Sequence, residues 1–272
     1  MNKYEPSTFF KTYAKIFRWD LEEYNFDFLN EVAVPPSNQS PPKEGFALNE
    51  IFDHIYIINL EKDVEKYKIT QDALQAYGIS ASRFEAINGL GVLEEYRALK
   101  KLHDESATAF WIREGLFRSP GCYGSTLSRI TILKDAVYNK YKKILILEDD
   151  IILHRDFHKL FHQFYSQLPH DWKILRLGAS ENSSWEDIKI EKSLYRYASQ
   201  PKTYGGFATG IDASVYEELL LEYEKKNGPN DVKLTQFAAT IYPDKNFVCF
   251  PNLVIANLNE SGNNAYTDKN NA

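Results

Sequence analysis

From residue 46 onward, short apolar runs alternate with longer runs whose apolar residues recur at helical spacing. Residues 54–60 (HIYIINL) are β-branched and aromatic, and the run is short enough for a buried strand. Residues 63–77 then carry apolar positions roughly on one side, and Gly78 is well placed to end such a helix. The alternation predicts an α/β fold with an open, mostly parallel sheet flanked by helices.

The same two patterns recur along the rest of this region. Residues 143–147 are apolar without polar alternation, which predicts a central parallel strand covered on both faces. Residues 92–118 have no clear period and predict only short helices and loops. The remaining patterns predict strands at 82–87, 172–177 and 247–256, and helices at 125–141, 156–168 and 212–223.

The first 45 residues differ from the rest of the chain. Residues 34–45 (VPPSNQSPPKEG) contain four prolines and predict an extended linker. We therefore divide the chain into an arm with its linker, 1–45, and a main domain, 46–272. Within the arm (1–33), helical spacing relates Phe9, Phe10, Tyr13, Ile16 and Phe17. The favoured interpretation is a short helix docked on the main domain, and the alternative is a helix that binds a partner or a membrane surface.

Composition narrows the classes of partner. The 272 residues carry a net charge of −6, which argues against a nucleic-acid partner. Cys122 and Cys249 form no disulfide framework and no C-x-x-C pair. Neither a signal-peptide pattern nor an apolar stretch long enough for a transmembrane segment occurs in the sequence. We expect a cytoplasmic protein.

Three adjacent acids interrupt the most apolar stretch, KKILILEDDIIL. Buried carboxylates are costly unless they are paired, hydrogen-bonded or metal-bound. The acids follow a predicted strand, and ligands of open parallel sheets lie beyond the carboxyl ends of the strands. In an extended chain Glu148 and Asp150 point to one face and Asp149 to the other, and oxygen ligands suit Mg²⁺ or Mn²⁺. The alternative is a helix cap, or pairing with the neighbouring Lys142 and Lys143.

Seven segments together resemble a known family. In chain order they are IYIINLEKDVEKY, RFEAINGL, YGSTLSRITILKDA, KKILILEDDIIL, DWKILRLG, TYGGFATGIDASVYEELL and NDVKLTQF. No single segment is specific, but their order and spacing over most of 54–262 resemble glycosyltransferase family 25. That family includes bacterial lipopolysaccharide and lipooligosaccharide galactosyltransferases and the collagen hydroxylysine galactosyltransferases.

The resemblance implies an A-type glycosyltransferase fold, a UDP-sugar donor, usually UDP-galactose, and inversion at the anomeric carbon. It also implies Mn²⁺ or Mg²⁺, which Asp150 would hold with help from Glu148. The expected reaction moves a hexose to a hydroxyl acceptor, such as a saccharide of lipopolysaccharide or lipooligosaccharide. The alternatives are a collagen-type hydroxylysine galactosyltransferase, a non-catalytic relative that binds glycans or nucleotides, and a sugar-nucleotide pyrophosphorylase. The last would need a Gly-rich basic loop, which INLEKDVEK is not.

The resemblance also implies a set of donor-binding residues. We expect the donor to contact Asn59, Lys66, Arg83, Asn88, Ser128, Arg129 and Asp149. Four positions depart from the family pattern: Lys66 stands for an Arg, Asn88 for an Asp, Ser125 for a Cys and Arg129 for a His. An arginine can hold a phosphate through two hydrogen bonds, whereas Asn88 cannot act as a base. For Asn59 a strand-end turn residue, and for Lys66 and Arg83 solvated surface charge, remain alternatives.

Asp231 is the candidate catalytic base that would activate the acceptor hydroxyl. It follows the loop signature Gly228-Pro229-Asn230 and precedes a helix-like run. A helix N-cap is the alternative, because Asp is favoured there. Asp212 is a weaker candidate for the same role.

Overall fold

The structure is a computed structural model, in which we describe residues 4–30, 43–106, 119–182, 189–190, 194–196 and 203–258. An eight-stranded sheet with the order β2-β1-β3-β10-β5-β11-β8-β7 forms its centre. Its strands are β1 His54–Asn59, β2 Ser82–Glu85, β3 Lys143–Glu148, β5 Ile174–Arg176, β7 Lys189–Ile190, β8 Leu194–Arg196, β10 Ala208–Asp212 and β11 Asn246–Cys249.

The sheet is mixed but mostly parallel. The pairings of β1 with β2, β1 with β3 and β5 with β11 are parallel, whereas β10 is antiparallel to both its neighbours. Strand β8 is antiparallel to β11 and to β7. Six of the eight strands therefore run in one direction, with β10 and β8 reversed, and the predicted α/β sheet is confirmed.

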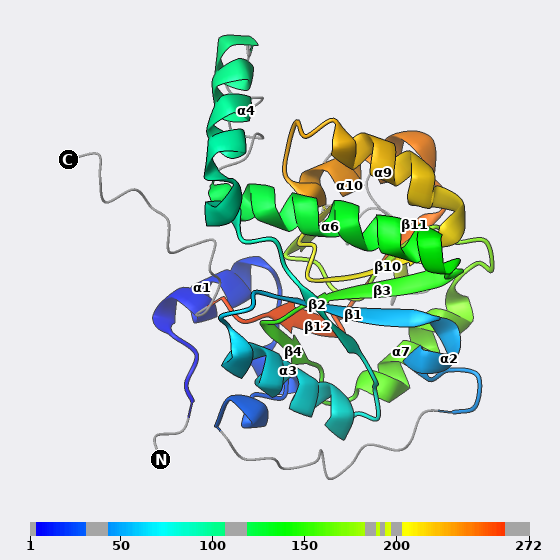
Figure 1. The fold of residues 1–272 in the computed structure, drawn as a ribbon. Helices are drawn as coiled ribbons and strands as arrows, with labels where there is room; N and C mark the ends of the chain where they lie inside the picture. Colours follow the sequence, from blue (N-terminus) through cyan, green and yellow to red (C-terminus); the bar gives the residue numbers. More distant parts are fainter. Residues whose placement is uncertain are drawn as a thin grey trace.

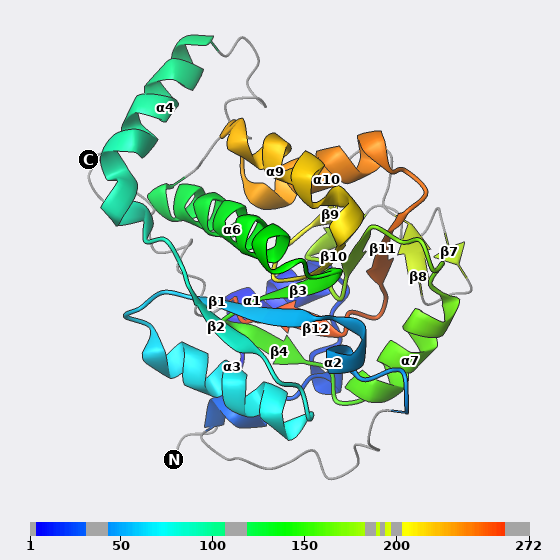
Figure 2. The same ribbon diagram turned by 45° about the vertical axis from the view of Figure 1, so that its right-hand side comes forward.

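Helices cover both faces of the sheet (Figures 1 and 2). On one side lie α6 Pro120–Asn139, α9 Tyr216–Glu224 and α10 Asn230–Ile241. On the other lie α3 Val64–Ala76, α7 Phe157–Gln167 and the small sheet of β4 Ile151–Leu153 with β12 Val254–Ala256. Successive side chains of β3 point to opposite faces of the sheet, so the strand contributes to the core on both faces. Ile144 and Ile146 join the core cluster that includes α6, whereas Leu145 and Leu147 join the other.

The remaining elements are short or peripheral. They are α1 Thr8–Ile16, α2 Leu48–Ile51, α4 Leu93–Ser106, the pair β6 Glu181–Asn182 and β9 Thr203–Tyr204, and the 3-10 turns η1 Leu21–Glu23, η2 Asp27–Asn30, η3 Gly89–Val92 and η4 Ala213–Val215. Helix α4 projects from the body (Figure 1). Among the described residues, no helix is both long enough and apolar enough to cross a bilayer.

The arm packs into the main core. Phe10, Trp19 and Tyr24 are buried in the same cluster as α3 and α7. Trp19 Nε1 donates to the carbonyl of Ala179 at 3.3 Å, and the Tyr24 hydroxyl donates to the carbonyl of Asn252 at 2.8 Å. In the described part of the arm, a helix is therefore present and the arm packs on the main domain. Residues 31–42, which include linker residues 34–42, lie outside the described part of the chain.

Five elements differ from the sequence prediction. The expected strand 247–256 is two strands in different sheets, because Pro251 cannot donate to a sheet ladder. The region 92–118 begins with the 14-residue helix α4. Helix α6 begins at Pro120 rather than 125, capped by the Ser119 hydroxyl, which accepts from Cys122 N at 3.1 Å. Strands β4 and β10 were not predicted.

Candidate functional site

The three acids lie at the carboxyl end of β3, in the turn that leads to β4. This is the edge at which ligands of open α/β sheets bind. Glu148 ends the strand, and its backbone N–H donates to the carbonyl of Phe207 at 2.9 Å. We call Glu148, Asp149 and Asp150 the acidic turn. Their three side chains have different environments.

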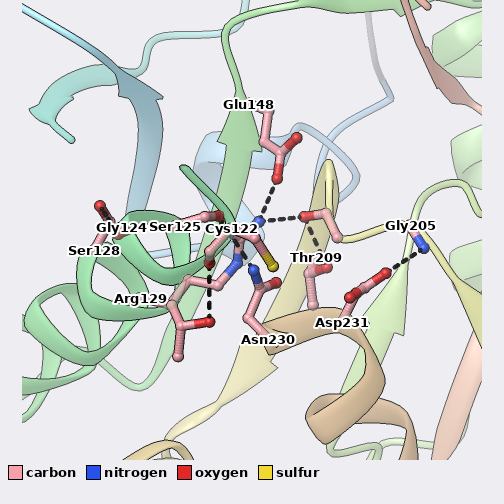
Figure 3. Close-up of polar contacts among 12 residues, drawn as sticks. Cys122, Gly124, Ser125, Ser128, Arg129, Glu148, Gly205, Thr209, Asn230 and Asp231 are labelled. Carbon is pink, nitrogen blue, oxygen red and sulfur yellow. Dashed lines mark hydrogen bonds and ion pairs between the residues drawn. The ribbon is translucent and has the colours of Figure 1, made fainter. Parts of the chain in front are cut away.

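Glu148 is paired with a buried arginine from α6. The Arg129 Nη2 donates to Glu148 Oε1 at 2.6 Å and to the carbonyl of Gly206 at 2.9 Å. Its Nη1 donates to Ser125 Oγ at 2.7 Å (Figure 3). Arg129 is only 3% exposed, while the Glu148 side chain is 33% exposed. The predicted donor contact of Arg129 is therefore not what this arrangement provides, because the guanidinium is engaged by the protein and neutralises Glu148.

Asp149 is hydrogen-bonded to the end of β1. Asn59 Nδ2 donates to Asp149 Oδ2 at 2.6 Å, and Asn59 Oδ1 accepts from Arg83 Nε at 2.9 Å. Burial raises the pKa of the Asp149 carboxyl, and the Asn59 hydrogen bond and the charge of Lys66 act in the opposite direction. Thr70, which the sequence analysis did not single out, donates to the Asp149 carbonyl at 2.7 Å. The structure thus brings together four of the predicted donor-binding residues.

Asp150 has no comparable partner. Its Oδ1 atom is buried and accepts no hydrogen bond within the described part of the chain. Burial, followed by the charges of Glu148 and Asp149, raises the pKa of the Asp150 carboxyl well above its usual range. The backbone beside it is fixed, since Asn257 N donates to the Asp150 carbonyl at 2.6 Å. A buried acidic oxygen without a partner needs a proton or a cation.

These residues fit a hard divalent cation with few protein ligands. Within the described residues, no group of three or more His, Cys, Asp or Glu is arranged to hold a metal ion. Mg²⁺ is usually held by one or two carboxylates together with substrate phosphates and water. Asp150, with Glu148 beside it, matches that ligand pattern.

Ser128 and Asn88 have structural roles in this arrangement. The Ser128 hydroxyl donates to the carbonyl of Gly124 and accepts from Ile87 N, both at 2.8 Å, and the residue is fully buried. It holds the segment after β2 against α6 and is not exposed in this arrangement, so its contact with the donor stays a prediction. Asn88 is exposed, and its Oδ1 caps η3 by accepting from Leu90 N at 3.0 Å.

Asp231 lies in the first turn of α10, whose N-cap is Pro229, so the N-cap interpretation is wrong. Its Oδ2 accepts from Gly205 N at 3.4 Å (Figure 3). Its carbonyl accepts from Arg176 Nη2 at 3.2 Å. Gly205 has φ of +96°, a conformation that favours glycine. Asp212 is at the opposite edge of the sheet, where it pairs with Lys143, the first residue of β3, in the β10–β3 ladder. It is therefore no candidate base in this site.

A polar chain connects Asn230, the residue before the base candidate, to the acidic turn. Asn230 Nδ2 donates to Ser125 Oγ at 3.1 Å, and the same oxygen accepts from Arg129. A Cβ at Gly206 would lie 2.9 Å from Asn230 Oδ1 and 3.0 Å from Arg129 Nη2, so glycine is needed for this approach. The sequence analysis missed Asn230 as a site residue. Its only signal was its place between a Gly-Pro loop and Asp231.

Comparison with known proteins identifies the family of this chain. A family model described as glycosyltransferase family 25 (LPS biosynthesis protein) matches residues 52–205, which are 154 of the 272 residues. The chain therefore belongs to glycosyltransferase family 25. It is a glycosyltransferase, which takes a sugar donor and an acceptor. With the mixed sheet described above, the expected A-type glycosyltransferase fold class is confirmed.

Other comparisons add little. A search of curated proteins gives no match. Among solved structures, the apo form of mouse xyloside xylosyltransferase 1 is similar with a TM-score of 0.34 and 10% sequence identity. That similarity covers 70% of this chain and 69% of the mouse chain.

Proposed function

We propose that the chain transfers a hexose, with galactose as the first candidate, from a UDP-sugar to a hydroxyl group of a saccharide. The observation that carries this proposal is the buried Asp150 Oδ1, which lacks a hydrogen-bond partner among the described residues. Asp150 would hold Mn²⁺ or Mg²⁺, helped by Glu148. When bound, the cation supplies positive charge that stabilises the departing diphosphate.

The donor nucleotide would bind beside the ends of β1 and β2. Asn59 connects Asp149 to Arg83, whose Nη2 donates to the carbonyls of Leu60 and Glu61 at 3.2 and 3.1 Å. These bonds fix the chain just after β1, at the carboxyl edge where nucleotides bind in such sheets. Arg129 would act on the donor only indirectly, by balancing the charge of Glu148.

Asp231 would accept the proton of the attacking acceptor hydroxyl. Its carboxylate is held by Gly205 N and its carbonyl by Arg176, so the group is oriented before substrate binds. An attack from the face opposite the leaving diphosphate inverts the anomeric carbon. The acceptor we propose is a saccharide of a lipid-linked glycan such as lipopolysaccharide, which is supported by the description of the matching family model.

The first test is a thermal melt with UDP, with Mn²⁺ and with both. A ligand at one hundred times its Kd stabilises the folded state by about 2.7 kcal/mol. For a chain of this size we expect a rise in Tm of roughly 5–10 °C that requires both ligands. Asp150→Ala should abolish the rise. Asp171→Asn, a surface acid paired with Lys245, is the control and should retain it. A rise that survives in Asp150→Ala would remove the acidic turn from the donor site.

The second test separates binding from transfer. Asp231→Asn should keep the UDP- and Mn²⁺-dependent rise in Tm, because the hydrogen bonds of Asp231 among the described residues go to Gly205, Arg176, Val232 and Thr235 and not to the acidic turn. It should reduce galactose transfer by about 10²–10⁴-fold, the usual contribution of a general base. Release of UDP from UDP-galactose with a glycan acceptor gives the rate. Transfer at the wild-type rate would mean that another group is the base.

A further inference from the structure

The N-terminal arm reaches the acidic turn through the last described strand. The Tyr4 hydroxyl donates to Asn257 Oδ1 at 2.9 Å, across 253 positions of sequence. Asn257 follows β12 and is only 1% exposed. Its backbone N–H donates to the Asp150 carbonyl at 2.6 Å. One residue therefore accepts from the arm with its side chain and donates to the acidic turn with its backbone.

The pairing of β12 with β4 explains why Asn257 meets Asp150. These strands are antiparallel, with Ala256 opposite Ile151, so the next residue of one strand lies beside the preceding residue of the other. The Tyr4 ring is itself held, because it stacks on Phe26 of the arm with 5.7 Å between ring centroids. Its hydroxyl is thus a fixed donor to Asn257.

A second contact of the arm supports Glu148. The Trp19 ring meets the Phe207 ring edge-on, with 6.4 Å between centroids. The Phe207 carbonyl accepts the backbone N–H of Glu148 at 2.9 Å. Both expected metal-binding residues therefore depend, through one intermediate residue each, on side chains of the first thirty residues. Figure 1 shows α1 beside β12, although they come from opposite ends of the chain.

We propose that the arm is a positioning element of the donor site, with Tyr4 and Asn257 as positioning residues that set the place of Asp150. The inference rests on the proposed function, because it assigns the arm to the metal-dependent binding of UDP. A docked arm keeps the Asp150 carbonyl bonded to Asn257. When the arm loosens, the turn loses that restraint, and the affinity for the diphosphate–metal pair falls.

The test compares two hydroxyl deletions in the same arm. Tyr4→Phe removes only the hydroxyl that reaches Asn257 and keeps the ring on Phe26. Tyr24→Phe removes a hydroxyl that donates to the Asn252 carbonyl, which is not bonded to the acidic turn. We expect Tyr4→Phe to raise the Kd for Mn²⁺ at saturating UDP by about 2–10-fold, as the loss of one hydrogen bond would. Tyr24→Phe should lower Tm and leave that Kd unchanged.

A measurement on the metal-free protein keeps this inference separate from the proposed function. Hydrogen exchange at the Asn257 amide, which bonds to Asp150, should be faster in Tyr4→Phe than in wild type or Tyr24→Phe. Equal exchange in both variants, or equal Kd values for Mn²⁺, would overturn the positioning role and leave a purely structural arm. If wild type shows no UDP binding with Mn²⁺, the proposed function fails, and the exchange rates still decide whether Tyr4 restrains the turn.

Discussion

Glu148 and Asp150 lie two residues apart in the acidic turn, but the protein treats their charges in opposite ways. Glu148 is partly exposed and paired with the buried guanidinium of Arg129. Asp150 has a buried oxygen with no partner in the described chain, and its pKa is raised by burial and by the other two acids. Of the two acids, Asp150 has the oxygen without a partner, so it is the first candidate ligand for a cation that Glu148 would help to hold.

The largest expected effect comes from removing the partner of Glu148. Arg129→Ala leaves an unpaired carboxylate and an empty space in the core, and it removes the hydrogen bonds of Arg129 to Ser125 and Gly206. Breaking a buried ion pair on one side costs about 3–5 kcal/mol, and we expect about 3 kcal/mol because Glu148 is partly exposed. Urea unfolding of the metal-free protein measures the loss. Arg129→Lys keeps the charge without the planar fork, and should recover only part of it.

Neutralising the two acids should change stability in opposite directions. In metal-free protein, Glu148→Gln should lower the free energy of unfolding, because Arg129 loses its counter-charge. Asp150→Asn should raise it by about 1 kcal/mol at pH 8, because an unpartnered buried carboxyl disappears. The pKa of Asp150 is raised in the folded protein, so this gain should shrink as pH falls and the native carboxyl takes up its proton. Urea midpoints at pH 8 and pH 5 measure both changes. If Asp150→Asn lowered the free energy of unfolding as Glu148→Gln does, the contrast between the two acids would be wrong.

The smallest expected effect concerns His154, a buried histidine that follows β4. His154 Nδ1 accepts from Asp156 N at 2.9 Å, and its Nε2 lies 3.5 Å from Glu23 Oε2. Burial lowers the pKa of His154, and the charge of Glu23 opposes that shift. As the pH falls, His154 therefore binds its proton at a higher pH in the unfolded chain than in the folded protein. The free energy of unfolding decreases as the pH drops below about 6.5, the ordinary pKa of histidine. His154→Asn should weaken this acid loss in urea titrations between pH 7 and 5. Burial also lowers the pKa values of His54 and His158, so these two residues would still contribute to the loss of stability in acid.

Local patterns were enough to predict the elements that build the carboxyl edge of the sheet. β1 and β3 are apolar runs bounded by polar residues, and the acids at the end of β3 mark the edge where a ligand would bind. The pattern could not predict β10, because ATGID is short and contains Thr209 and Gly210. Strand β10 has a glycine at position 210 because the Phe52 ring occupies the space beside it. A Cβ at Gly210 would lie 2.8 Å from Phe52 Cε1.

Pairings between distant residues were beyond sequence reasoning. Arg129 and Glu148 are separated by a helix end and a strand, and only the packing of α6 on β3 brings them together. Resemblance placed Arg129 near the donor, but its hydrogen bonds assign it to Glu148. The contact of Tyr4 with Asn257 joins the two ends of the chain, and no local period carries that information.

That end-to-end contact has a consequence for synthesis of the chain. Tyr4 and Tyr24 are synthesised 253 and 228 positions before their respective partners, Asn257 and Asn252. Contacts so distant in sequence must await closure of a very long loop, which slows folding. Tyr4 and Tyr24 therefore cannot form these contacts until residues 252–257 have been translated. We expect a nascent chain stalled before residue 250 to bind chaperones through the arm, and a chain extended past residue 258 to lose that binding.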